Sequence, residues 1–163
     1  MNIANFTEKS KQAMTMASNL ATTNKNAEIT EFHVLLSLIS TEDGLVTLLL
    51  KKMEIDMYAL RSACQLEIEN MSQISGNVAL RFSENMEHAL ESAEKQANSM
   101  KDEFISVEHI MLGMVEQASP EFKQLLKLYG ISKAKFLSAL KDVRGNTTVR
   151  SDTPEETYDA LSK

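Results

Sequence analysis

The apolar residues of this chain recur at helical spacing along most of its length. Between residues 7 and 22 they fall three or four positions apart, which places them on one face of a helix with 3.6 residues per turn. The members of this stripe are Ala13, Met14, Ala17, Leu20 and Ala21. Residues 32–39 are apolar on nearly every side, a pattern typical of a central, buried helix. Shorter stripes around Leu49 and Leu60 predict a third and a fourth helix.

The pattern then occurs a second time. Phe82 follows Phe6 by 76 residues, and the same offset matches residues through most of the chain without a gap. Matched pairs include Glu8 with Glu84, Ala17 with Ala93, Ile29 with Ile105, His33 with His109, and Leu49 with Leu125. Matches in one register over such a length indicate an internal duplication. We therefore expect an all-α fold in which two four-helix repeats, residues 1–75 and 76–146, pack about a pseudo-twofold axis as one globular domain.

Helix starts and stops are also marked. Thr30 and Ser106 precede the second helix of each repeat, and either side-chain oxygen can accept a hydrogen bond from a free amide of the first turn. Gly130 follows the third helix of the second repeat, where glycine allows a left-handed backbone. Glu54 stands at the matching position of the first repeat. We therefore expect the third helix of the first repeat to end differently.

The end of the chain changes in character. Residues 144–152 are polar and contain Gly145-Asn146, which predicts a linker. Thr153, Pro154 and Glu156 then form a helix start, with a cap, a proline at the first helical position and a capping-box glutamate. We expect residues 147–163 to be a linker and the start of a helix that leads into a further domain.

Composition narrows the range of partners. The net charge is −6, from 17 Lys+Arg against 23 Asp+Glu, and the basic residues form no dense cluster. Nucleic-acid-binding domains carry a basic face, so we do not expect nucleic acid as a partner. The longest apolar run falls far short of the roughly 20 residues that cross a bilayer, and the first residues do not resemble a secretory leader. We expect a cytoplasmic protein with no membrane contact.

Candidate catalytic and metal-binding residues have simpler explanations. His33 and His109 each stand at the third position of a helix, without acidic partners at metal-ligand spacing, so we expect buried or capping histidines. Glu8 and Glu84 fall in first helical turns, where the helix dipole favours an anion, and are not expected to form an acid–base pair. The single cysteine, Cys64, lies on an apolar stripe and is expected to be a buried thiol. We predict a chain that is not an enzyme and holds no cofactor or metal.

One segment carries a recognisable motif. Ile105-Ser106-Val107-Glu108-His109-Ile110-Met111-Leu112 resembles the repeat motif of Clp amino-terminal domains. The opening Phe6-Thr7-Glu8-Lys9 and the duplication fit the same family over residues 1–146. The first repeat departs from the motif at Phe32, where the family has glutamate. Residues 144–161 resemble the link from this domain into the first ATPase domain of ClpB-type protein disaggregases.

The resemblance implies a function. ClpB-type proteins are stress-response chaperones that form hexameric rings, use ATP and magnesium, carry a coiled-coil insertion and work with the DnaK chaperone system. Their amino-terminal domain helps to engage substrates. This chain lacks the Gly-rich phosphate-binding loop that ends in Gly-Lys-Ser/Thr, so ATP and magnesium are expected only in the full-length protein. The resemblance thus implies a substrate-capture domain that binds unfolded or aggregated polypeptide through a partly apolar groove.

Transferring the groove of the family residue by residue gives five positions: Thr7, Leu90, Asp102, Glu108 and His109. Leu90 would cover apolar side chains of the substrate, while Asp102 and Glu108 would accept hydrogen bonds from its unpaired amides. His109 stands where relatives can have leucine, which makes that part of the groove less apolar.

Other interpretations stay open. Thr7 is also a natural helix cap, and Glu108 lies in a first helical turn, so both residues have structural roles without any substrate. The domain would instead dock a folded adaptor protein if it belonged to a ClpA- or ClpC-like unfoldase. An independent small enzyme would need a nucleophile and a base placed together, and the sequence supplies no such pair.

Overall fold

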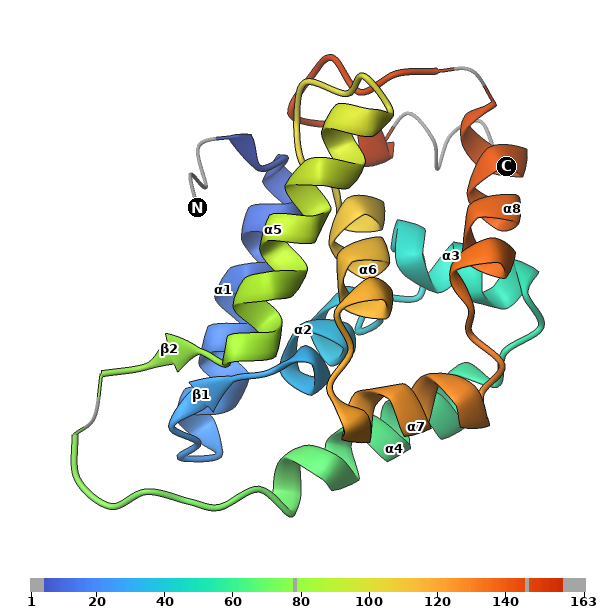
Figure 1. Ribbon diagram of the computed structural model, residues 1–163. Helices are drawn as coiled ribbons and strands as arrows, with labels where there is room; N and C mark the ends of the chain where they lie inside the picture. The colour runs from blue at the N-terminus through green and yellow to red at the C-terminus, as the bar shows by residue number, and fades with distance from the viewer. Residues whose placement is uncertain (1–4, 78, 146, 157–163) are drawn as a thin grey trace.

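The computed structural model describes residues 5–77, 79–145 and 147–156. In these ranges the chain forms eight α-helices and two very short strands (Figure 1). The first repeat contains α1 (Glu8–Thr23), β1 (Glu28–Ile29), α2 (Glu31–Leu38), α3 (Leu45–Lys52) and α4 (Met57–Glu69). The second contains β2 (Arg81–Phe82), α5 (Glu84–Ser99), α6 (Val107–Glu116), α7 (Pro120–Leu128) and α8 (Lys133–Arg144). The predicted all-α fold of two four-helix repeats is confirmed.

Two short parallel pairings join the repeats. In one, Ile29 of β1 pairs with Phe82 of β2; in the other, Phe6 pairs with Ile105. The 76-residue offset converts one pairing into the other, so each repeat makes the same contact with its partner. The amides that follow the two phenylalanines donate to the carbonyls of the two isoleucines, both at 3.0 Å. This reciprocity is the signature of the expected pseudo-twofold axis.

The centre of the domain is formed by α2 and α6, which lie to the right of α1 and α5 in Figure 1. Every residue of α2 except Leu36 is buried, as its apolar sequence predicted. Phe32 of α2 meets Phe122 of α7 edge to face, with ring centroids 5.3 Å apart. The core therefore runs through both repeats. Within the described part of the chain, none of the helices has the length and apolar character required to cross a bilayer.

The two repeats differ in how closely their first two helices approach. A Cβ atom built on Gly113 of α6 would lie only 2.1 Å from the carbonyl oxygen of Ala89 in α5. The backbones of α5 and α6 therefore touch directly. The matching position in α2 is Ser37, whose hydroxyl donates to the carbonyl oxygen of His33 at 2.8 Å. Correspondingly, α1 and α2 contact each other much less extensively than α5 and α6 do.

The expectation for the end of α3 is wrong. Glu54 has φ = +62° and Gly130 has φ = +70°, so both repeats turn through the left-handed region at this point. The turns are closed by the same bonds, since the amides of Ile55 and Ile131 donate to Leu50 and Leu126. The following helix in each repeat must start in the same direction, and this requirement outweighs a local backbone cost of about 1–2 kcal/mol for a residue with a Cβ.

The close approach of α5 and α6 predicts an asymmetric response to alanine. Gly113→Ala should lower the free energy of unfolding by about 3 kcal/mol, because its Cβ has no space against rigid backbone. Ser37→Ala at the matching position should change it by less than about 1 kcal/mol, since only one hydrogen bond is lost and a better helix former is gained. Urea unfolding followed by circular dichroism measures both values. Equal values for the two variants would contradict this account of the helix contact.

Candidate functional site

A histidine closes the start of the second helix in each repeat. Nδ1 of His33 accepts a hydrogen bond from the amide of Thr30, and Nδ1 of His109 accepts one from the amide of Ser106, both at 2.9 Å. An amide can only donate, so the ring proton of each neutral histidine is on Nε2. In the first repeat this proton points to Oδ1 of Asn26 at 2.9 Å. Burial lowers the pKa of His33 to about 4, which keeps it neutral. Both residues are buried capping histidines.

In the second repeat the same histidine belongs to a charged network. Asp102 stands at the position that matches Asn26, and its Oδ2 lies 2.7 Å from Nε2 of His109. Arg144, the last residue of α8, reaches Oδ1 of Asp102 at 2.7 Å and Oε2 of Glu108 at 3.4 Å. The carboxylate side chains are fully buried, and only 6% of the Arg144 side chain is exposed. A buried network of this kind depends on every member being paired.

The pKa of Asp102 reflects two opposing effects, its burial and its bonds within the network. Burial by itself would raise the pKa of this carboxyl. The hydrogen bonds from His109, Arg144 and the amide of Val149, together with the charge of Arg144, outweigh that effect and hold the pKa below its ordinary value. Asp102 therefore stays ionised in the folded domain.

The segment that follows α8 covers this network. We call residues 147–156 the tail. The tail crosses the end of the molecule where α1 and α6 begin (Figure 1). Its Val149 is fully buried, donates from its amide to Asp102 at 2.8 Å and accepts from the amide of Glu103 at 2.7 Å. The carbonyl of Asp152 accepts from the amide of Glu8 at 2.8 Å. The segment expected to be a linker is therefore hydrogen-bonded to the domain at Val149 and at Asp152.

The tail ends in a buried glutamate. Residues 154–156 are helical, which agrees with the predicted helix start, and the remainder of that predicted helix lies outside the described residues. Oε2 of Glu155 accepts from the hydroxyl of Thr7 at 2.6 Å and from the amide of Val107 at 3.2 Å. Burial, and then the neighbouring charge of Glu108, raise the pKa of Glu155 to about 7. Oε1 of each of these two glutamates is buried without a hydrogen-bond partner.

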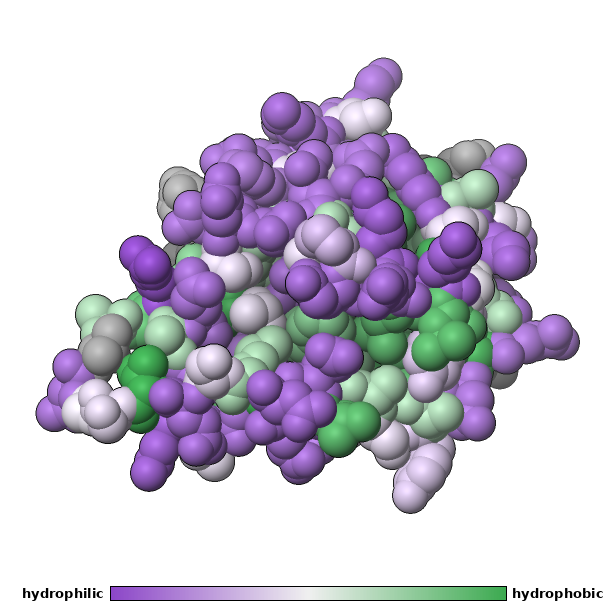
Figure 2. All heavy atoms as spheres, turned by 60° about the horizontal axis from the view of Figure 1, so that its bottom comes forward, coloured by the Kyte–Doolittle hydropathy of each residue, from purple (hydrophilic) through white to green (hydrophobic). Residues whose placement is uncertain are grey.

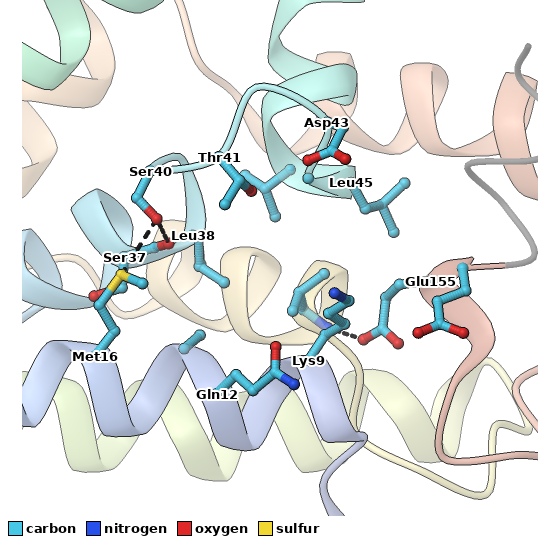
Figure 3. Close-up of a pocket in the computed structure, with 15 residues that line it drawn as sticks. Lys9, Gln12, Met16, Ser37, Leu38, Ser40, Thr41, Asp43, Leu45 and Glu155 are labelled. Carbon is cyan, nitrogen blue, oxygen red and sulfur yellow. Dashed lines mark hydrogen bonds between the residues drawn. The ribbon is translucent and has the colours of Figure 1, made fainter.

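A cavity of about 310 Å³ opens beside Glu155, between α1, residues 37–46 and the start of α6. Its apolar walls come from Ala13, Met16, Leu38, Leu45, Val46 and Val107. Lys9, Gln12 and Asp43 add polar groups. In Figure 3, Met16, Ser37 and Ser40 lie at one end and Glu155 at the other. The walls thus combine aliphatic surface with polar groups, including the positive side chain of Lys9 and the negative side chain of Asp43.

The cavity exists because the repeats have diverged. At the matching place in the second repeat, Gly113 lets α5 and α6 close, and Glu31 accepts a hydrogen bond from the amide of Ser119 at 2.9 Å. In the first repeat Ser37 replaces the glycine, and Val107 stands at the position that matches Glu31. Val107 cannot accept a hydrogen bond, so the corresponding closure does not form. Sequence periodicity gave no sign of this difference, because it depends on contacts between repeats.

Four of the five predicted groove residues gather beneath the tail. Asp102, Glu108 and His109 form the buried network, and Thr7 holds Glu155. Leu90 belongs to the core on α5 and is 4% exposed. None of the five lines the open cavity.

Sequence reasoning missed Arg144 and Glu155. Arg144 follows Phe136 and Leu140 at steps of four, so the stripe of α8 carried a usable signal for its burial. Nothing local indicated that Glu155 would dock, because its partners are 148 and 48 residues away. The described residues contain no cluster of three or more His, Cys, Asp or Glu side chains arranged to hold a metal ion.

The sequence and the fold of this chain both match a known family of protein domains. Residues 5–129 match the family described as the Clp repeat (R) N-terminal domain. The N-terminal domain of Hsp104 from Candida albicans superposes with a TM-score of 0.82, covering 93% of this chain and 99% of that one at 20% identity. A ClpV N-domain in complex with a VipB peptide gives a TM-score of 0.64 at 20% identity, covering 84% of this chain and 89% of that one.

The chain belongs to the family of Clp repeat amino-terminal domains, and in its ClpB and Hsp104 homologues this domain is non-catalytic. Its similarity to the chaperone protein ClpB of Clostridium tetani is 35% identity over 167 aligned residues. The alignment covers 100% of this chain and 19% of that relative, so the chain spans about a fifth of its length.

The buried network predicts a large difference between two arginines. Arg144→Met should lower the free energy of unfolding by about 3–5 kcal/mol, because it leaves two buried carboxylates without their cation. Arg150→Met removes an exposed ion pair with Glu103, 3.4 Å long, and should cost less than about 1 kcal/mol. Urea unfolding at pH 7 measures both. A loss below about 1 kcal/mol for Arg144→Met would contradict the role assigned to the network.

Proposed function

We propose that this domain captures extended segments of unfolded or aggregated polypeptide for a ClpB-type chaperone. One observation carries the proposal: the chain's own tail lies at the edge of the cavity, held largely through its backbone. The amide and carbonyl of Val149 and the carbonyl of Asp152 are all hydrogen-bonded to the domain. Main-chain bonds of this kind are independent of sequence, so the same edge suits many polypeptides.

The walls of the cavity fit such a ligand. An unfolded segment offers apolar side chains together with unpaired amides and carbonyls. Met16 is 40% exposed at one end of the cavity, and its flexible thioether adapts to side chains of different shape. Lys9 and Asp43 supply a cation and an anion for polar groups of the ligand. A cavity of about 310 Å³ covers only a few side chains, which suits weak and transient binding.

The predicted groove residues form the covered end of the proposed site. Thr7, Asp102, Glu108 and His109 would meet a polypeptide only where the tail moves away, because the tail lies over them. Leu90 supports this end from the core. The site therefore has an open apolar part and a covered polar part.

The wider role is also part of the proposal. We place this domain in a cytoplasmic hexameric ring that uses ATP and magnesium and works with the DnaK chaperone system on aggregated proteins. The similarity to ClpB chaperones supports this assignment. The ATP and magnesium chemistry would lie in regions that correspond to the remaining length of those relatives.

A second candidate is the docking of a folded adaptor protein. Tyr58 and Leu66 on α4 are 81% and 58% exposed, and with Leu36 and Arg61 they border a shallow hollow. Figure 2 shows apolar patches, separated by hydrophilic residues, on the face of the molecule that is turned forward there. The ClpV N-domain that resembles this fold was solved with a VipB peptide, so a protein partner is in keeping with the fold.

The capture proposal is tested with reduced, alkylated α-lactalbumin as the unfolded probe. Met16→Glu should weaken binding at least about fivefold, because about 1 kcal/mol of apolar contact is lost and a charge enters the cavity. Leu128→Glu is the matched control, since Leu128 is 77% exposed on α7 and does not line the cavity. Fluorescence anisotropy with the labelled probe measures both affinities.

Leu66→Glu separates the two surfaces. Loss of probe binding with Leu66→Glu and not with Met16→Glu would place the polypeptide site on α4 and contradict the cavity as the site of capture. Failure of the unsubstituted domain to bind the probe at all would overturn the capture proposal.

A further inference from the structure

The docked tail carries an energetic cost, because it buries a second carboxyl group beside one that is already buried. Glu155 and Glu108 place two carboxyl groups together in the protein interior, and one oxygen of each has no hydrogen-bond partner. A buried polar atom in this condition costs about 1–3 kcal/mol, and more when it is charged. Arg144 compensates Glu108 incompletely, because it lies 3.4 Å from Glu108 but 2.7 Å from Asp102.

The attachments of the tail offset this cost. Glu8 and Val107 are the first residues of α1 and α6, whose opening amides have no partner within their own helices. The carbonyl of Asp152 takes the first amide and the carboxyl of Glu155 takes the second. Val149 adds a buried side chain. These attachments therefore act against the cost of burying the two carboxyl groups.

We infer that the tail is an intramolecular latch on the polypeptide site, and that a bound segment displaces Glu155 from the hydroxyl of Thr7 and the amide of Val107. This inference rests on the proposed function of the cavity. Glu155 and Val107 both line that cavity, so a ligand that fills it meets the latch directly. Release of the tail frees the amides of Glu8 and Val107, which a carbonyl or carboxylate of the substrate then takes over.

The stability of the docked tail should fall as the pH rises. The docked Glu155 has its pKa raised to about 7, by burial first and by Glu108 on α6 second. The other charged groups that line the adjoining cavity are Lys9 on α1, Asp43 before α3 and Glu156 on the tail. A carboxyl whose pKa rises on docking stabilises the docked state most at low pH, and that contribution is lost as the pH rises through about 7. The latch is therefore tighter at pH 6 than at pH 8.

Two substitutions in the whole chain should shift the latch in opposite directions. Glu155→Ala removes both attachments of the side chain and should tighten binding of reduced, alkylated α-lactalbumin about three- to tenfold. Glu155→Gln keeps an acceptor for Thr7 and Val107, removes the negative charge and offers an N–H to Glu108. It should weaken binding about threefold and abolish the difference between pH 6 and pH 8. Glu121→Ala is the control, because it removes an exposed negative charge from α7, outside the tail and the lining of the cavity, and should leave binding unchanged.

Amide hydrogen exchange tests the latch without relying on affinity. The amides of Glu8, Glu103 and Val149, which hold or belong to the tail, should exchange at least about fivefold faster in Glu155→Ala and when the probe is bound. Probe binding by the unsubstituted domain, with equal affinity for both Glu155 variants and unchanged exchange, would overturn the latch and leave the capture proposal standing. No probe binding combined with faster exchange in Glu155→Ala would overturn the capture proposal, and with it the competition assigned to the tail.

Discussion

The structure depends on one reciprocal contact, in which Phe6 pairs with Ile105 and Ile29 pairs with Phe82. Buried amides and carbonyls must find partners, and at these positions each repeat finds them only in the other. Neither repeat therefore completes its own backbone hydrogen bonds. The same contact brings the first turns of α1 and α6 together, because each helix begins directly after a paired strand residue and its cap. The tail, the cavity and the buried network all lie around this junction.

Sequence differences between the two repeats leave a cavity at one of two equivalent places in the pseudo-twofold fold. A glycine at position 113 and a serine at position 37 set different separations for equivalent helix pairs. Glu31 closes the space next to α7, whereas Val107 at its matching position leaves the equivalent space open. Such small exchanges act strongly because interiors are close-packed, and a single added atom decides whether two backbones can touch.

The helices, the residues at which they start and the buried character of α2 were predictable, since each is encoded by residues a few positions apart. The end of α3 was predicted wrongly at Glu54, because a turn required by the next helix outweighs a local backbone preference. The family motif pointed to Asp102, Glu108 and His109, and these residues do lie together. It gave no indication of Arg144 or Glu155, which join the cluster from the far end of the chain.

The sequence by itself determined the helical class, the duplication and its register, because periodicity and a fixed offset are properties of the chain alone. The tertiary structure decided which of two equivalent spaces stays open and which polar groups become buried. Those outcomes depend on distances between segments as much as 148 residues apart, as between Thr7 and Glu155. Burial and pairing of this kind are set by the whole packed domain, and so is the raised pKa of Glu155 at the edge of the cavity.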